Sequence, residues 1–112
     1  MDKILKNIEF EKTLELGSLV QYQEGQVVSR TLAQNQYVSV TLFSFDKGEE
    51  ISSHSSKGDA LVTVLDGEAE ITIGDKKHIV KSGQSIVMPA HVPHALFAKE
   101  RFKMLLVVVF PC

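Results

Sequence analysis

Hydrophobic and polar positions alternate with a period of two along most of this chain. The clearest example is residues 68–73, in which Ala69, Ile71 and Ile73 alternate with polar residues. Because successive side chains of a strand point to opposite faces, this alternation predicts strands with one buried face. We predict strands at residues 19–23, 26–33, 36–46, 50–53, 60–66, 68–73, 77–81, 85–88, 94–98 and 102–110.

Turn-forming residues separate the predicted strands. Asp66-Gly67 and Ser82-Gly83 are two such turns, and Gly74 lies in the turn of a hairpin. About nine or ten short strands, with turns roughly every eight to twelve residues, are typical of an all-β sandwich or barrel. Residues 1–17 lack this regularity and predict a short arm with one helical turn.

Length and charge exclude several classes of protein. The chain has 112 residues, enough for one core and one domain. A net charge of −2 offers no basic excess for nucleic acid or an anionic membrane surface. The longest apolar run, residues 104–110, is too short to span a bilayer, and the first ten residues do not resemble a secretion signal. We expect a cytoplasmic protein without nucleic-acid or membrane partners. The single cysteine, Cys112, allows no internal disulfide.

Two stretches carry glycine, proline and histidine at fixed spacings. In chain order these residues are Gly48, His54, Gly67, Gly83, Pro89 and His94. Their spacing resembles the two motifs of the small single-domain cupins (cupin 2 or RmlC-like barrels), G-x5-H-x-H-x3-E-x6-G and G-x5-P-x-G-x2-H-x3-N. The resemblance implies an all-β fold, the cupin double-stranded β-helix or jelly-roll barrel. Residues 1–112 would form a single cupin domain, with the barrel at 36–110 and an arm and strands for dimerisation at 1–35.

The resemblance also implies a metal site, and this chain departs from it. In metal-binding cupins two histidines and a glutamate of the first motif join the histidine of the second. His54 and His94 match, but Ser56 stands at the second histidine and Ala60 at the glutamate. Two imidazoles alone hold a divalent ion poorly, since such sites usually have three or more protein donors. No cofactor is therefore certain, and a zinc, manganese, iron or nickel ion on His54 and His94, with His91 as a possible third ligand, stays open.

Alternation also predicts the lining of a pocket inside the barrel. Counting along the strands turns these residues inward: His54, Ser56, Ala60, Val62, Val64, His94, Leu96, Phe102, Met104, Leu106 and Val108. We expect a small ligand to contact His54, Ser56, Ala60, Val62, His94, Leu96 and Met104. In the alternative, the two histidines are structural and hydrogen-bond to each other, to Ser56 or to the backbone. Asp59 is expected to face away and stabilise a turn, and Lys103 to face out.

The sequence therefore leaves three function classes. The first is a protein that binds a small molecule in an apolar pocket without a conventional metal site. The second is a metal-dependent enzyme of dioxygenase or isomerase type, and the third is a purely structural protein. Catalytic residues are not identified, because neither a nucleophile elbow nor a glycine-rich phosphate loop occurs. We expect a homodimer whose N-terminal strands pair with the neighbour's sheet; the rival is a monomer whose arm folds over its own barrel.

Overall fold

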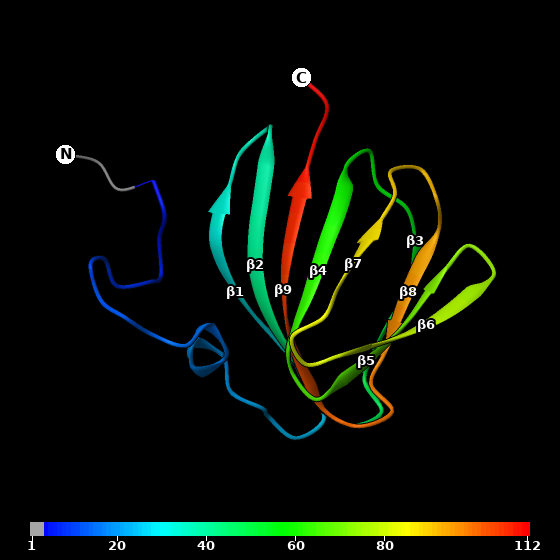
Figure 1. Cartoon of the computed structure of the whole chain (residues 1–112), viewed down its shortest axis with the longest axis horizontal. Helices are drawn as coiled ribbons and strands as arrows, with labels where there is room; N and C mark the ends of the chain where they lie inside the picture. Colours follow the sequence, from blue (N-terminus) through cyan, green and yellow to red (C-terminus); the bar gives the residue numbers. More distant parts are fainter. Residues whose placement is uncertain (1–3) are drawn as a thin grey trace.

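The computed structural model describes residues 4–112 and consists of two antiparallel sheets that face each other (Figure 1). In chain order the strands are β1 (Val27–Gln34), β2 (Val38–Phe45), β3 (Glu50–His54), β4 (Asp59–Asp66), β5 (Glu68–Ile73), β6 (Lys76–Lys81), β7 (Ser85–Met88), β8 (His94–Phe97) and β9 (Phe102–Val109). One sheet has the order β1-β2-β9-β4-β7 and the other β3-β8-β5-β6. The predicted all-β double-stranded β-helix is confirmed.

The two sheets enclose one main core, and the period-two pattern decides which residues enter it. In β4, Ala60, Val62 and Val64 are buried between the sheets, while Leu61 is 42% exposed. On β9, Phe102 and Met104 are buried in the same core, and Lys103 points outward, as predicted. Alternation therefore predicts the inner face of these strands, because successive side chains point to opposite faces of a sheet.

The strand predicted at residues 19–23 is wrong. A 3-10 turn, η1 (Leu16–Leu19), ends at the first of these residues, and residues 20–23 form no strand. Outward-facing side chains of the five-stranded sheet donate hydrogen bonds to main-chain carbonyl oxygens of this region. Ser44 Oγ donates to the Gln21 carbonyl at 2.8 Å, and Lys103 Nζ donates to the Gly17 carbonyl at 2.7 Å. Val20 is extended as predicted, but the Gln21 carbonyl bonds to a side chain rather than to a neighbouring strand.

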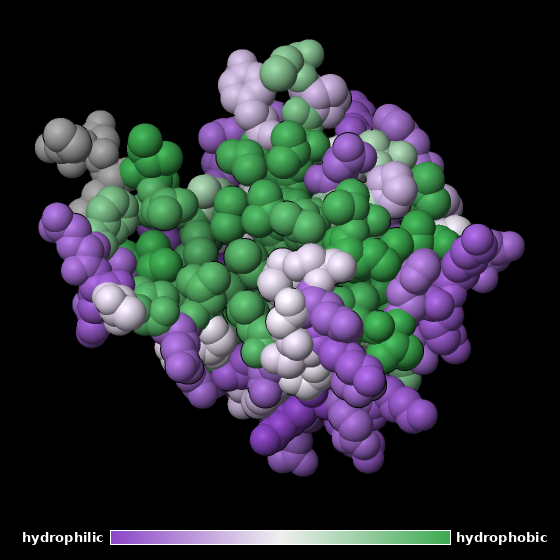
Figure 2. Space-filling view, viewed as in Figure 1, coloured by the Kyte–Doolittle hydropathy of each residue, from purple (hydrophilic) through white to green (hydrophobic). Residues whose placement is uncertain are grey.

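The N-terminal arm folds over the barrel of its own chain. Its apolar side chains pack with the outer face of the five-stranded sheet in a second cluster that contains Ile8, Leu16, Leu19, Val20, Leu32, Val40, Leu42, Leu65 and Leu105. The Lys6 amide also donates to the Leu32 carbonyl on the free edge of β1. In Figure 2 the apolar surface of the arm is continuous with that of the barrel. The first three residues of the predicted arm lie outside the described part of the chain.

No helix among residues 4–112 is long and apolar enough to cross a membrane. The one helical element in this part of the chain is the single turn of η1.

Candidate functional site

A cavity of about 250 Å³ lies between the two sheets. It is lined by Gln34, Ser39, Phe43, Ile51, His54, Ser56, Ala60, Met88, His94, Leu96, Met104, Leu106, Val108 and Phe110. Strands β1, β2, β4, β7 and β9 contribute one wall, and β3 and β8 the facing wall. Most of the lining is apolar, and no lining residue carries a formal charge. The cavity is therefore suited to a compact, mainly apolar molecule.

The structure gathers six of the seven sequence-predicted pocket residues around this cavity. These six are His54, Ser56, Ala60, His94, Leu96 and Met104. Val62 lies in the fully buried core instead of the lining. It points to the same side as Ala60, but it lies two residues farther into the barrel, where the sheets pack against each other without a gap.

Several lining residues were not assigned to the pocket from the sequence. Ser39 and Phe43 of β2 face the cavity because they alternate with Val40 and Leu42, which pack under the arm. Gln34, Ile51, Met88 and Phe110 are the others, together with Leu106 and Val108, which were predicted only to face inward. The alternation of β2 indicates that Ser39 and Phe43 share one face of the strand, but the sequence alone did not show which of the two faces points into the cavity.

His54 and His94 are a cross-strand pair of β3 and β8. They lie opposite each other in the antiparallel register, and their ring centroids are 4.5 Å apart in an edge-to-face arrangement. A β-bulge makes this pairing possible: Ile51 pairs with Leu96, but the next pair is His54 with His94, so that two residues of β3 face one of β8. The extra residue turns His54 to the same face as Ile51.

Each imidazole is hydrogen-bonded to the backbone of its own strand or loop. His54 Nδ1 lies 3.0 Å from the Ser52 carbonyl oxygen, and His94 Nδ1 lies 3.2 Å from that of Val92. His54 is exposed at the mouth of the cavity, whereas His94 is only 4% exposed. Burial lowers the pKa of His94; the bond to Val92 opposes this, and the neighbouring His54 lowers the pKa further. His94 is thus held as the neutral imidazole at neutral pH.

The residues of the cavity do not fit a conventional cupin metal site. Ser56 stands at a ligand position, but its Oγ donates to the Gly58 carbonyl and accepts from the Gly58 amide, which fixes it to the loop before β4. Ala60 places a methyl group where a carboxylate ligand belongs. No group of three or more His, Cys, Asp or Glu side chains among residues 4–112 lies close enough together to hold a metal ion.

The two other residues considered for the site lie outside the cavity. Asp59 is exposed, and its Oδ1 accepts a hydrogen bond from the Ala90 amide at 2.8 Å, so it stabilises the loop before β8. His91 lines a separate surface groove with Asp59 and Lys57. Its φ of 66° is in the left-handed region, where glycine is favoured. His91 is therefore not brought together with His54 and His94.

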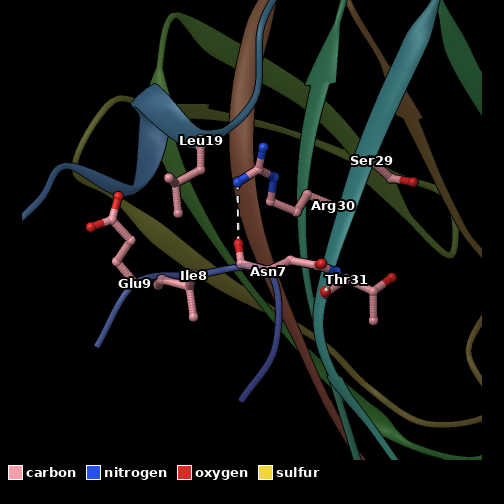
Figure 3. Close-up of a pocket in the computed structure, with 7 residues that line it drawn as sticks. All are labelled: Asn7, Ile8, Glu9, Leu19, Ser29, Arg30 and Thr31. Carbon is pink, nitrogen blue, oxygen red and sulfur yellow. Dashed lines mark hydrogen bonds between the residues drawn. The ribbon is translucent and has the colours of Figure 1, made fainter.

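A larger hollow of about 720 Å³ lies between the arm and β1 (Figure 3). It is open to the surface, and its polar groups hold the arm in place. The Arg30 guanidinium donates to the Asn7 carbonyl at 3.1 Å, and the Asn7 side-chain amide donates to the Thr31 carbonyl at 2.8 Å. We interpret this hollow as the seam between arm and sheet, because the Arg30 guanidinium and the Asn7 amide are already hydrogen-bonded across it.

Comparison with known proteins places this site in context. Residues 41–110 match the family model described as the Cupin domain. A conserved protein of unknown function from Streptococcus pyogenes is 53% identical, with a TM-score of 0.97 over 99% of this chain and 97% of that one. A cupin superfamily protein from Desulfitobacterium hafniense is 42% identical, with a TM-score of 0.91 over 96% and 98%.

A third solved structure is that of a longer protein. A cupin 2 conserved barrel domain protein from Leptotrichia buccalis is 48% identical, with a TM-score of 0.84 over 86% of this chain but 47% of that one. No curated protein matches the sequence.

Proposed function

The chain belongs to the cupin family, and we propose that it binds a small, mostly apolar molecule in the barrel cavity, with His54 and His94 at the polar end. The observation that carries this proposal is the cavity itself: about 250 Å³ of space, lined mainly by apolar side chains, with two adjacent imidazoles. Well-packed protein interiors rarely leave a void much larger than a water molecule. A cavity of this size next to two polar groups is therefore best explained by a ligand.

The size of the cavity limits the ligand. An apolar cavity of about 150 Å³ is enough to bind benzene, and most ligand pockets span roughly 300–1,000 Å³. The volume here lies between these values. It favours a molecule of one ring or a short branched chain over a nucleotide or a sugar derivative.

The alternative function is a metal-dependent enzyme of dioxygenase or isomerase type. The adjacent imidazoles of His54 and His94 favour it. Two of the expected ligand positions argue against it: the Ser56 hydroxyl is already bonded to Gly58, and Ala60 offers only a methyl group. Elemental analysis of the protein purified without a tag or chelator decides between the two: about one equivalent of a transition metal per chain would favour the enzyme.

Filling the cavity tests the proposed function. Ala60→Phe places a ring in the cavity, and Leu61→Phe places the same ring on the exposed face of the same strand. We expect the unmodified protein and Leu61→Phe to bind toluene, detected by NMR shifts of residues around the cavity. Ala60→Phe should lose at least tenfold in affinity. Equal binding by both variants would place the ligand elsewhere and exclude this function.

The assembly we propose is a homodimer, through a sheet face rather than through the N-terminal strands expected from the sequence, because β1 pairs with β2 and the arm packs on the barrel of its own chain. It is supported by a row of aliphatic side chains across the outer face of the five-stranded sheet, where Leu61 pairs with Val87 on one side and Val107 on the other. Leu61 and Val87 are about half exposed, as is Val109 farther along β9. The arm covers the neighbouring part of this face, so this row is the part left for a second copy.

Light scattering during size exclusion tests the dimer. We expect twice the chain mass of 12.4 kDa, and a monomer for Leu61→Lys. A 12.4 kDa species for the unmodified protein at micromolar concentration would contradict the dimer and show a monomer.

A further inference from the structure

Backbone hydrogen bonds fix the tautomer of both cavity histidines. The Nδ1 atoms of His54 and His94 face the carbonyl oxygens of Ser52 and Val92 at 3.0 and 3.2 Å. A carbonyl oxygen can only accept, so each Nδ1 must carry the proton. In a neutral imidazole the second nitrogen, Nε2, then has a lone pair and no proton. Each ring in its neutral form therefore offers the rest of the site a hydrogen-bond acceptor.

The Nε2 atom of His94 is reachable from the cavity. The hydrogen bond found for its side chain within residues 4–112 is the one at Nδ1. In the same part of the chain no buried side-chain nitrogen or oxygen lacks a hydrogen-bond partner. A sealed, unpartnered Nε2 is thus excluded, and since His94 lines the cavity, this atom faces the cavity space.

Ser56, the polar lining residue nearest to His54 in the chain, has no proton to offer a ligand. The Ser56 hydroxyl already donates to the Gly58 carbonyl. The other polar residues of the lining, Gln34 and Ser39, are a cross-strand pair of β1 and β2 in the opposite sheet. On the wall formed by β3 and β8, the imidazoles of His54 and His94 therefore present acceptors, and the side-chain donors lie on the facing wall, at Gln34 and Ser39.

From this arrangement we propose that the ligand is an uncharged, mainly apolar molecule whose polar end donates a hydrogen bond, such as the hydroxyl group of a phenol or an alcohol. This inference rests on the proposed function, the binding of a small molecule in the cavity. On the wall of β3 and β8 a carboxylate would face the lone pair of His94, and a cation would find no acidic side chain in the lining. Either ion would lose its hydration without compensation, whereas a hydroxyl group satisfies an acceptor that is otherwise open.

Three probes of similar size test the donor requirement. Phenol has a donor, anisole has the same oxygen without a donor, and toluene has neither. Affinities are measured by NMR titration at about pH 8, where histidine is neutral. We expect phenol to bind better than anisole. Replacing His94 by Phe should lower the preference for phenol over toluene about three- to tenfold, the value of one hydrogen bond.

Two further variants complete the design. His54→Phe removes the exposed acceptor and keeps the test valid if His94→Phe does not fold. His91→Asn is the control, because it removes an imidazole outside the cavity at a left-handed position that Asn tolerates. It should leave the preference unchanged.

The outcomes separate the ligand class from the proposed function. If toluene binds and Ala60→Phe blocks it, but the phenol preference is the same in all histidine variants, the donor inference is wrong and the binding cavity stands. If none of the three probes binds, the binding cavity itself is refuted. A nitrogen-15 NMR spectrum of the imidazoles is an independent check: Nε2-protonated tautomers would overturn the inference.

Discussion

The turn between β4 and β5 gives the sharpest prediction about stability. Gly67 carries the chain from one sheet to the other with a φ of 74°. A Cβ atom there would overlap the Arg101 carbonyl oxygen and lie 3.2 Å from both Cα and Cβ of the buried Phe102. None of these neighbours is the end of a flexible side chain, so the backbone would have to move. Gly67→Ala should therefore combine backbone strain with overpacking.

Gly83 separates these two contributions. Its φ is 86°, but a Cβ atom there would have no neighbour within 4 Å. Gly83→Ala should cost only the left-handed conformation, about 1–2 kcal/mol. Gly67→Ala should cost that amount plus about 1–3 kcal/mol for the overlap. The entropy that alanine removes from the unfolded chain is common to both variants and cancels in the comparison.

Urea unfolding followed by circular dichroism measures the difference. A total stability of about 5–15 kcal/mol leaves both variants folded enough to compare. We expect Gly67→Ala to be less stable than Gly83→Ala by about 1–3 kcal/mol, with unchanged m-values. Equal losses in the two variants would refute the argument, because the close approach of Arg101 and Phe102 would then have no energetic consequence.

Three further predictions concern the site and its rim. The pKa of His94 is lower in the folded protein than in the unfolded chain, so the unfolded chain takes up a proton first as the pH drops through about 6.5. The free energy of unfolding should therefore fall over this range and level off below the pKa of the folded protein. The urea midpoint should show this between about pH 7.5 and 5, and a slope as steep in His94→Phe would contradict it. Combining Ser56→His with Ala60→Glu should raise zinc affinity at least tenfold by calorimetry; a folded double variant that binds no more tightly would mean that these side chains do not converge. His91→Gly should relieve left-handed strain and raise stability by about 0.5 kcal/mol, whereas a loss in urea unfolding would point to a stabilising contact of the imidazole.

Much of the barrel could be predicted from the sequence, because alternation is a local property. Each strand with one buried face shows it, and β4, β5 and β9 lie where the pattern placed them. The glycines that end or join strands are equally local: Gly67 and Gly83 adopt positive φ values that other residues avoid. The strand predicted at residues 19–23 failed for the opposite reason, since the Gln21 carbonyl bonds to the side chain of Ser44, which lies in a strand remote in sequence.

The histidine site shows where local reasoning ends. Strict alternation counted back from the inward-facing Ala60 predicts that the His54 side chain faces inward. Strict alternation counted forward from the inward-facing Ile51 predicts that it faces outward. The bulge in β3 resolves this conflict, and the bulge exists because β3 pairs with β8, some forty residues farther along the chain. The acceptor character of both imidazoles likewise depends on the carbonyl oxygens that their rings face.

Sequence alone therefore determined the fold, the inner faces of most strands and the candidate histidines. The tertiary structure decided that His54 and His94 are neighbours, that Val62 is core rather than lining, and that Ser56 is already bonded to its own loop. The physical reason is that burial of one strand face is encoded residue by residue. The direction of a single ring or hydroxyl group, in contrast, follows from hydrogen bonds and pairings that form only when distant strands meet.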